Sequence, residues 1–290
     1  MRNILLSMTM LLLMVPATAQ NWATSLKSTD VVPGMYMLEG ADGFGGGNMT
    51  LLIGDKVFLI DDGILPTGAL LIELAEKKAQ RPIDFVINTH VHGDHVGGNS
   101  ALADDGTLLI AHDNIRKRLL DDPAEAGGPS GLPTITFSDA MTFHINGHEA
   151  YVFHVEAAHT DGDAVIHFRD INVIHAGDVH FNYLFPFIDI DRGGSVAGYL
   201  AAQRLVIEMS DEDTIIIPGH GSLASKADLQ IALDMLVDAE ARVKKLVDAG
   251  MSQDEVLAEN PLADYHEQWN WSFITTEVMT MTLYRSLTDG

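Results

Sequence analysis

The segment 90–98 constrains the fold of this chain more than any other feature. It reads HVHGDHVGG, so three imidazoles and one carboxylate, from His90, His92, Asp94 and His95, fall within six residues. The segment follows an apolar run, residues 83–87, that predicts a buried strand. Side chains of these types converge when they share a metal ion, and glycine lets the backbone pass close to it. The alternative, a solvated polar loop, gives no reason for this spacing.

Three later segments repeat the same arrangement with single residues. His159, Asp178 and His220 each follow a predicted strand, at 150–155, 171–174 and 214–217, and each lies beside glycine or another small residue. One histidine at a strand end is weak evidence for a ligand. Together with segment 90–98, however, the three residues supply what a two-metal site still needs.

These four segments resemble the metallo-β-lactamase superfamily, whose mark is HxHxDH followed by a separate His, Asp and His in this order. The resemblance covers about residues 35–225. It implies an α/β fold, a four-layer αβ/βα sandwich with the metals at one edge between the two sheets. It also implies the following ligands: His90, His92 and His159 for the first metal, Asp94, His95 and His220 for the second, and Asp178 bridging both.

The resemblance implies two Zn²⁺ per chain and a hydrolase that cleaves an acyl bond with a metal-bridging hydroxide. Imidazole and carboxylate suit zinc, and the chain has no cysteine to offer instead. Asp94 is expected to act in catalysis by orienting the hydroxide. Two alternatives stay open: a mono-iron sulfur oxygenase and a metal-binding protein without catalysis. A third function of the superfamily, that of the diiron reductases, is disfavoured. These proteins typically have Glu where this chain has Gly93.

A β-lactam is the first substrate expected, and a lactone or thioester is the alternative. The Gly-rich loop 40–48 resembles the flap over the substrate of β-lactamases, with Phe44 at its tip. Two features oppose a β-lactam. Asp178 stands where many lactamases have Cys or Ser, and Phe181 stands where many place a Lys for the substrate carboxylate.

Other aromatic and polar residues are assigned more simply. His180, Asn182 and Tyr183 closely follow the expected bridging ligand and are candidate substrate contacts. Trp269 and Trp271 are expected to anchor the core. Arg192 is expected to be an exposed structural residue.

The first 19 residues predict a secretory signal peptide. Residues 4–15 are mostly apolar, and Pro16 and a small-x-small site, Ala17-Thr18-Ala19, follow them. We expect a periplasmic or secreted protein without a membrane anchor after cleavage. Residues 20–290 are expected to form a single domain with a helical C-terminal segment.

Charge and periodicity complete the expectations. The formal net charge is −24, which disfavours nucleic acid and leaves a small-molecule substrate as the expected partner. Apolar spacing predicts helices at 66–80, 114–120, 196–209, 227–249 and 272–287, and a short helix after the capping box at Ser252. Residues 121–133, rich in Gly, Pro and Asp, are expected to form a long loop.

Overall fold

The computed structural model describes residues 21–288, and its first sheet is built by the N-terminal half. The strand order is β1 to β7 in sequence. The strands are β1 Leu26–Val32, β2 Met35–Gly40, β3 Met49–Ile53, β4 Val57–Ile60, β5 Phe85–Ile87, β6 Leu108–His112 and β7 Ile135–Phe137. Strands β1 to β4 are antiparallel, and β4 to β7 are parallel. The expected signal peptide lies outside the described residues.

The second sheet is built by the following part of the chain, in the order β13-β12-β11-β10-β9-β8. Its strands are β8 Ala140–Ile145, β9 His148–His154, β10 Ala164–Phe168, β11 Val173–Phe181, β12 Ile215–His220 and β13 Ala224–Ser225. Strands β11 and β12 are parallel, and the other pairs are antiparallel. All nine residues of β11 are buried, as expected of a central strand covered on both faces.

The two sheets face each other across an apolar core. Phe58 and Ile110 of the first sheet share this core with Val152, Ile166 and Ile217 of the second. Apolar side chains that alternate along the strands point into this layer on one face and towards helices on the other.

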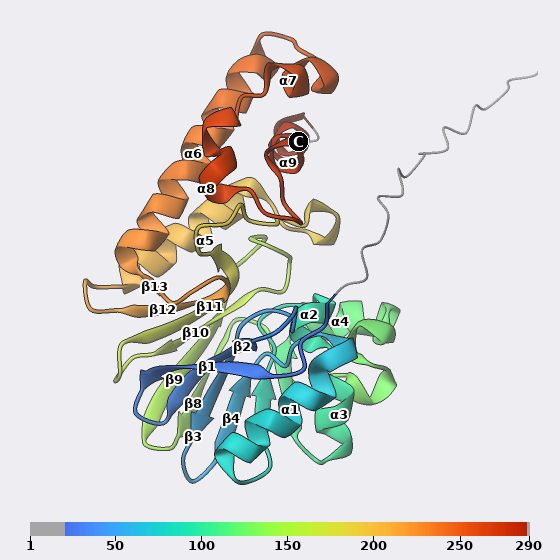
Figure 1. Cartoon of the computed structure of the whole chain (residues 1–290), viewed down its shortest axis with the longest axis vertical. Coiled ribbons are helices and arrows are strands. Elements are labelled where there is room, and N and C mark those ends of the chain that lie inside the picture. Colours follow the sequence, from blue (N-terminus) through green and yellow to red (C-terminus); the bar gives the residue numbers. More distant parts are fainter. Residues whose placement is uncertain (1–20, 289–290) are drawn as a thin grey trace, which may run out of the picture.

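Helices cover the outer faces of both sheets. Helix α1, Leu65–Ala79, and helix α3, Asn99–Asp104, pack on the first sheet through a cluster that includes Leu71 and Leu102. Helix α5, Val196–Met209, and the start of helix α6, Lys226–Asp248, pack on the second sheet. The result is the four-layer αβ/βα sandwich that the sequence predicted (Figure 1).

The last helices form a lobe beyond the second sheet (Figure 1). Helices α5 and α6 share a core there with α7 Gln253–Glu259, α8 His266–Trp269 and α9 Thr276–Thr288. Both α6 and α7 begin at a capping box, at Ser225 and Ser252. Within residues 21–288, no helix combines the length and apolar character needed to cross a bilayer.

The structure also contains elements that the sequence did not predict. Strands β1, β7 and β13 and helix α3 were not expected. The expected long loop 121–133 begins in the last turn of helix α4, Asp113–Asp121, and contains two short 3₁₀ helices, η1 Pro123–Ala126 and η2 Pro129–Gly131.

Candidate metal centre

The predicted ligands meet at one edge of the sandwich, where strands of both sheets end. His90 and His92 lie in the loop after β5, and Asp94 and His95 lie in the single turn α2, Gly93–Val96. From the second sheet come His159, after β9, together with Asp178 in β11 and His220 at the end of β12. The seven side chains therefore come from both halves of the chain and converge as the sequence predicted.

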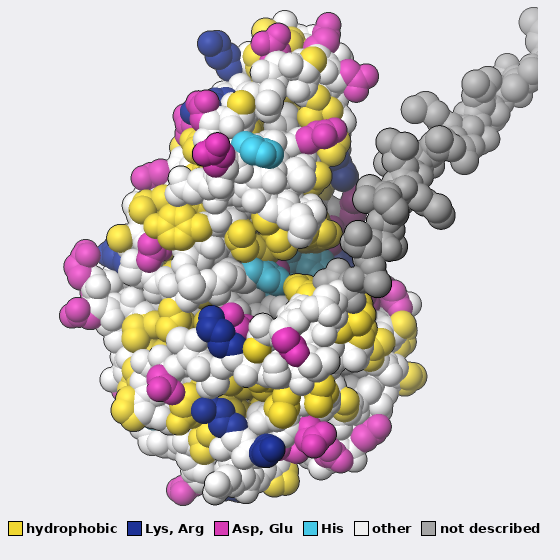
Figure 2. Space-filling view, viewed as in Figure 1, with side chains coloured by type: hydrophobic (Ala, Val, Ile, Leu, Met, Phe, Trp, Pro, Cys, Tyr) yellow, Lys and Arg dark blue, Asp and Glu magenta, His cyan; other side chains and the backbone are white. Residues whose placement is uncertain are grey.

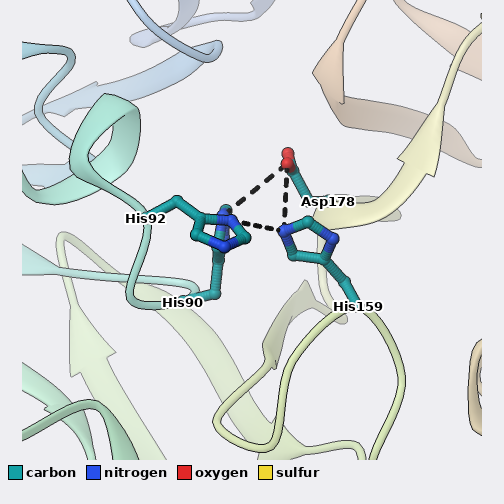
Figure 3. Close-up of side chains that lie close together, drawn as sticks. All are labelled: His90, His92, His159 and Asp178. Carbon is teal, nitrogen blue, oxygen red and sulfur yellow. Dashed lines mark hydrogen bonds and ion pairs between the residues drawn. The ribbon is translucent and has the colours of Figure 1, made fainter. Parts of the chain in front are cut away.

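One group of four residues could hold a metal ion. The ligand atoms of His90, His92, His159 and Asp178 all lie within 4.8 Å of one another (Figure 3). His159 Nε2 lies 2.8 Å from His92 Nδ1 and 3.4 Å from Asp178 Oδ2. His90 Nε2 lies 3.6 Å from the same carboxylate oxygen. These are the three histidines expected for the first metal together with Asp178, which was expected to bridge both metals.

A second group shares Asp178 with the first. His95, Asp178 and His220 could hold an ion together, and so could His90, Asp94 and His95. His95 Nε2 lies 3.2 Å from Asp178 Oδ1, and His220 Nε2 lies 3.3 Å from Asp94 Oδ2. The two oxygens of Asp178 thus face different groups, which is the geometry that a bridging carboxylate requires. The roles as ligands stay predictions.

Hydrogen bonds on the outer side of the cluster fix the imidazole rings. His95 Nδ1 donates to Asp61 Oδ2 at 2.8 Å, and His92 Nε2 donates to Asp189 Oδ2 at 2.9 Å. His159 Nδ1 donates to the carbonyl oxygen of Phe187 at 2.6 Å. In the neutral form of each ring the other nitrogen carries a lone pair and faces the cluster, as in metal-binding histidines.

Glycines let the backbone approach the cluster closely. A Cβ atom on Gly47, in the Gly-rich loop, would lie 2.1 Å from His95 Cε1. A Cβ atom on Gly219, just before His220, would lie 1.9 Å from Asp178 Oδ1. Neither position can accept a side chain unless a ligand moves.

The charges of the cluster suit a cation. Burial lowers the pKa of His159 to about 3 and also lowers that of His90, so both rings are neutral at pH 7. Burial would raise the pKa of Asp178, but the charge of His95 outweighs it and the pKa falls to about 2. Burial would likewise lower the pKa of His95, but Asp178 and Asp94 raise it well above its usual range. The centre of the cluster thus stabilises positive charge.

Several inward atoms have no hydrogen-bond partner among the described residues. They are His90 Nε2, His95 Nε2 and Asp178 Oδ1, and all three are buried. Buried polar atoms are normally paired, because an unpaired one costs about 1–3 kcal/mol. A metal ion at the cluster would satisfy all three, so the residues present fit a metal centre.

Comparison with known proteins identifies the family. The model of the metallo-beta-lactamase superfamily matches residues 42–220, which include all seven predicted ligands. The chain belongs to the metallo-beta-lactamase superfamily. The resemblance seen in the sequence is therefore confirmed.

Two curated relatives of this superfamily resemble the chain in sequence. A metallo-beta-lactamase type 2 of a Bacillus species is 26% identical over 172 residues, which cover 57% of this chain and 62% of that protein. The match thus spans less than two thirds of the Bacillus protein. A probable metallo-hydrolase of Methanocaldococcus jannaschii is 39% identical over 188 residues, which cover 62% of this chain and 89% of that protein.

Solved structures of the superfamily share the fold. A metallo-beta-lactamase from Pontibacter korlensis aligns with a TM-score of 0.65 at 16% identity, covering 74% of this chain and 100% of its own. The DIM-1 metallo-beta-lactamase aligns with a TM-score of 0.62 at 17% identity, covering 74% and 98%. At these identities the likeness establishes the fold alone, and it confirms the predicted architecture.

In this member of the superfamily, the cluster of His and Asp side chains opens into a cavity of about 950 Å³. Its floor includes His92, Asp94, Asp178 and His220, and Phe44 contributes from the Gly-rich loop as predicted. Figure 2 shows histidine side chains inside a hollow between the sandwich and the helical lobe, with hydrophobic side chains around it. The cavity therefore gives a small molecule access to the cluster.

Three of the predicted substrate contacts lie elsewhere, and the structure corrects them. His180 is fully buried, and neither it nor Asn182 or Tyr183 lines the cavity. The pairing of β11 with β12 is irregular between Gly177 and Phe181, so Asp178 and Phe181 both line the cavity whereas the side chain of His180 is enclosed elsewhere. Asn182 instead binds the carbonyl oxygen of Ser222 through Nδ2, and the Tyr183 hydroxyl donates to Asp228.

Several cavity residues were missed by sequence reasoning. Phe181 and Phe187 line the cavity, and so do Trp271 and Phe273 from the segment between α8 and α9. Trp269 is buried in the core as expected, whereas Trp271 is only partly buried and also faces the cavity. These residues lie in irregular segments or at a strand end, where no periodicity marks them.

Asp61 and Asp189, which orient ligand rings, were also missed. Asp61 directly follows the apolar run of β4, as His90 follows β5. An acid at the end of a buried strand was the available signal. Asp189 lies in an irregular segment, where the sequence contains no comparable signal.

Proposed function

We propose that this protein is a binuclear zinc hydrolase that cleaves an acyl bond of a small molecule. The observation that carries the proposal is the pair of His-rich groups that share the two carboxylate oxygens of Asp178. Two ions held by a common carboxylate lie close enough to act on one substrate.

Zinc fits the donor set. In the proposal His90, His92 and His159 hold one ion, His95 and His220 hold the other with Asp94, and Asp178 contacts both. Imidazole and carboxylate without thiolate are common in catalytic zinc sites. When bound, zinc would supply Lewis-acid activation of a water molecule and of an acyl carbonyl.

Asp94 is the residue best placed to handle the proton. Its side chain is 22% exposed, lines the cavity and lies 3.3 Å from His220 Nε2. Burial would raise its pKa, but His95 and His220 outweigh burial and lower it, so the carboxylate is charged at pH 7. A charged carboxylate facing the cavity can accept a hydrogen bond from a water molecule, orient it, take its proton as it attacks, and pass that proton to the leaving group.

A β-lactam amide is the first candidate substrate, supported by the name of the Bacillus relative and by the shared fold. A lactone or thioester is the second candidate. It is favoured by Phe181, an apolar residue in the cavity wall where many lactamases have a Lys for the substrate carboxylate.

Metal analysis and a substrate panel test the proposal. We expect about two zinc ions per purified chain and hydrolysis of at least one β-lactam, lactone or thioester, lost on chelation and restored by zinc. Asp94→Ala should lower kcat by roughly 10²-fold or more, the scale of general acid–base catalysis, without unfolding the protein. Iron with oxygen uptake, or zinc without turnover of any substrate, would refute the proposal.

A further inference from the structure

The cavity wall above the metal cluster is mainly aromatic. Phe187 and Phe273 lie edge to face with ring centroids 5.3 Å apart, and Trp271 and Phe273 lie 5.6 Å apart. Trp271 also lies 6.1 Å from Phe181, and both rings lie beside the ring of the cluster residue His220. These rings form one continuous surface that suits a flat apolar group.

One aromatic ring of this wall is open to solvent. Phe273 is 58% exposed, although it stands in a folded segment between two helices of the lobe. Its neighbour Trp271 is held by a hydrogen bond from Nε1 to the carbonyl oxygen of Phe185, 2.9 Å long. An exposed ring beside a fixed one is available to a bound molecule.

The charged residues of the wall are all acidic. Among the described residues, the lining of the cavity contains no Lys or Arg, and it contains the carboxylates of Asp94, Asp122, Glu125 and Asp178. In the proposed function Asp94 and Asp178 are occupied by the metals. Asp122 remains, and within residues 21–288 its side chain accepts only a backbone hydrogen bond, from Ala124.

Two cations close to the cavity are already paired. Arg192 donates to Glu125 Oε1 at 2.8 Å and also lies 3.9 Å from Asp189 Oδ2. Lys27 lines a smaller adjoining cavity and lies 2.9 Å from Glu39 Oε1. The positive charge of each side chain is thus already balanced by a carboxylate of the protein.

From this wall we infer that the enzyme selects acyl substrates that carry a flat apolar group and no carboxylate. The inference rests on the proposed hydrolase function and narrows its substrate class. Away from the metal positions, a substrate carboxylate beside Asp122 would be desolvated without a Lys or Arg partner, whereas an uncharged group meets no charge repulsion there. The net charge of −24 also repels anions over longer distances.

Matched substrate pairs test the inference. Each pair has one scissile bond, in a β-lactam, an aryl lactone or an aryl thioester, and differs only in a remote carboxylate or carboxamide. Each kcat/KM is divided by the rate of alkaline hydrolysis of the same compound, which removes differences in intrinsic reactivity. We expect the carboxamide member to be favoured by roughly tenfold or more in every pair that is turned over.

A charge placed in the wall should reverse this preference. Ser272 lines the cavity and is exposed, and its hydroxyl makes no hydrogen bond to another described residue. Ser272→Lys should raise kcat/KM for carboxylate members several-fold relative to Ser272→Gln, which has similar length without charge. Ala227→Lys, on an exposed position of α6 outside the cavity, adds the same charge and should leave the preference unchanged.

The outcomes separate the two claims. Faster turnover of the carboxylate members, or equal turnover that Ser272→Lys does not change, overturns this inference alone. Turnover of neither member of any pair by the zinc-loaded enzyme overturns the proposed function and this inference with it.

Phe273→Ala provides a second readout: kcat/KM should fall more for aryl than for methyl acyl groups, and an equal fall would contradict the role of the aromatic wall.

Discussion

At the scale of single residues, Asp61 is the clearest support for the metal centre. It is fully buried and accepts hydrogen bonds from the Thr89 amide and hydroxyl as well as from His95. Its φ of 56° lies in the left-handed region, which is unusual for a residue other than glycine. Such strain persists where the surrounding structure determines the conformation, and here it aims the carboxylate at a ligand ring.

Asp61→Asn should weaken zinc binding about 10- to 100-fold, because the amide no longer stabilises the outward N–H of His95 as a carboxylate does. A competition titration with a chromophoric chelator measures the change. Asp55→Asn, at an exposed hairpin position, serves as the control and should bind zinc like the wild type. An unchanged affinity of Asp61→Asn would show that Asp61 acts only in folding.

Asp163 predicts a pH dependence of stability. It is buried and accepts hydrogen bonds from the Thr160 amide and hydroxyl, yet burial raises its pKa to about 8. The folded state therefore holds this proton more tightly than the unfolded state, where the value is near 3.8. Asp163 therefore makes its full contribution to the free energy of unfolding below about pH 4, and this contribution is lost as pH rises through 8.

Urea unfolding of zinc-saturated protein at pH 5, 7 and 9 tests this prediction. Asp163→Asn removes the ionisable group, so its midpoint should fall less over this range than that of the wild type. Because both proteins keep the same metal ligands, the difference between them reports Asp163. Parallel pH profiles would contradict the raised pKa.

At the scale of elements, the close pairing of β11 and β12 positions the bridging carboxylate. The two strands are parallel, and Gly177 pairs with Pro218, so Gly219 passes directly beside Asp178. The backbone of β12 thus forms one wall of the metal centre.

Gly219→Ala should therefore displace Asp178 and lower the zinc content below one ion per chain, while circular dichroism shows a folded protein. Gly250→Asn is the matched control, because nothing lies within 4 Å of its Cβ position and Asn tolerates its φ of 81°. Two zinc ions per chain in Gly219→Ala would show that Asp178 can adopt another position.

The elements also show what the sequence could predict. Long amphipathic helices were found nearly to the residue, as with α5 at Val196–Met209, because apolar spacing over several turns is a strong signal. The strands β7 and β13 contain three and two residues, too few for an alternating pattern. The residues that meet in the cluster could be predicted because chemically distinctive side chains follow buried strands. The aromatic wall was not, because tertiary packing alone brings Phe187 and Trp271 together with the cluster.

At the scale of the whole molecule, the metal centre joins the two sheets. His90, His92 and His95 belong to the half that forms the first sheet, and Asp178 and His220 belong to the second. An ion bound to both halves stabilises the folded state by its binding free energy.

Removal of zinc should therefore lower the free energy of unfolding, by about 4 kcal/mol if zinc was present at 1,000 times its Kd. Urea unfolding with and without a chelator measures the effect, and added zinc should restore the midpoint. His159→Ala, which lacks a predicted ligand, should respond less to the chelator than the wild type. Identical midpoints for the loaded and stripped wild type would argue against an ion shared by the two halves.

The separation of the ligands along the chain has a consequence for biosynthesis. His90 is made well over a hundred residues before His220, and the two come together only after both sheets have paired their strands. A nascent or truncated chain that ends before β12 has an incomplete set of donors, whatever the zinc concentration around it. The group that contains His220 is therefore completed late, so occupancy of both proposed metal positions would report that β12 has joined the second sheet beside β11.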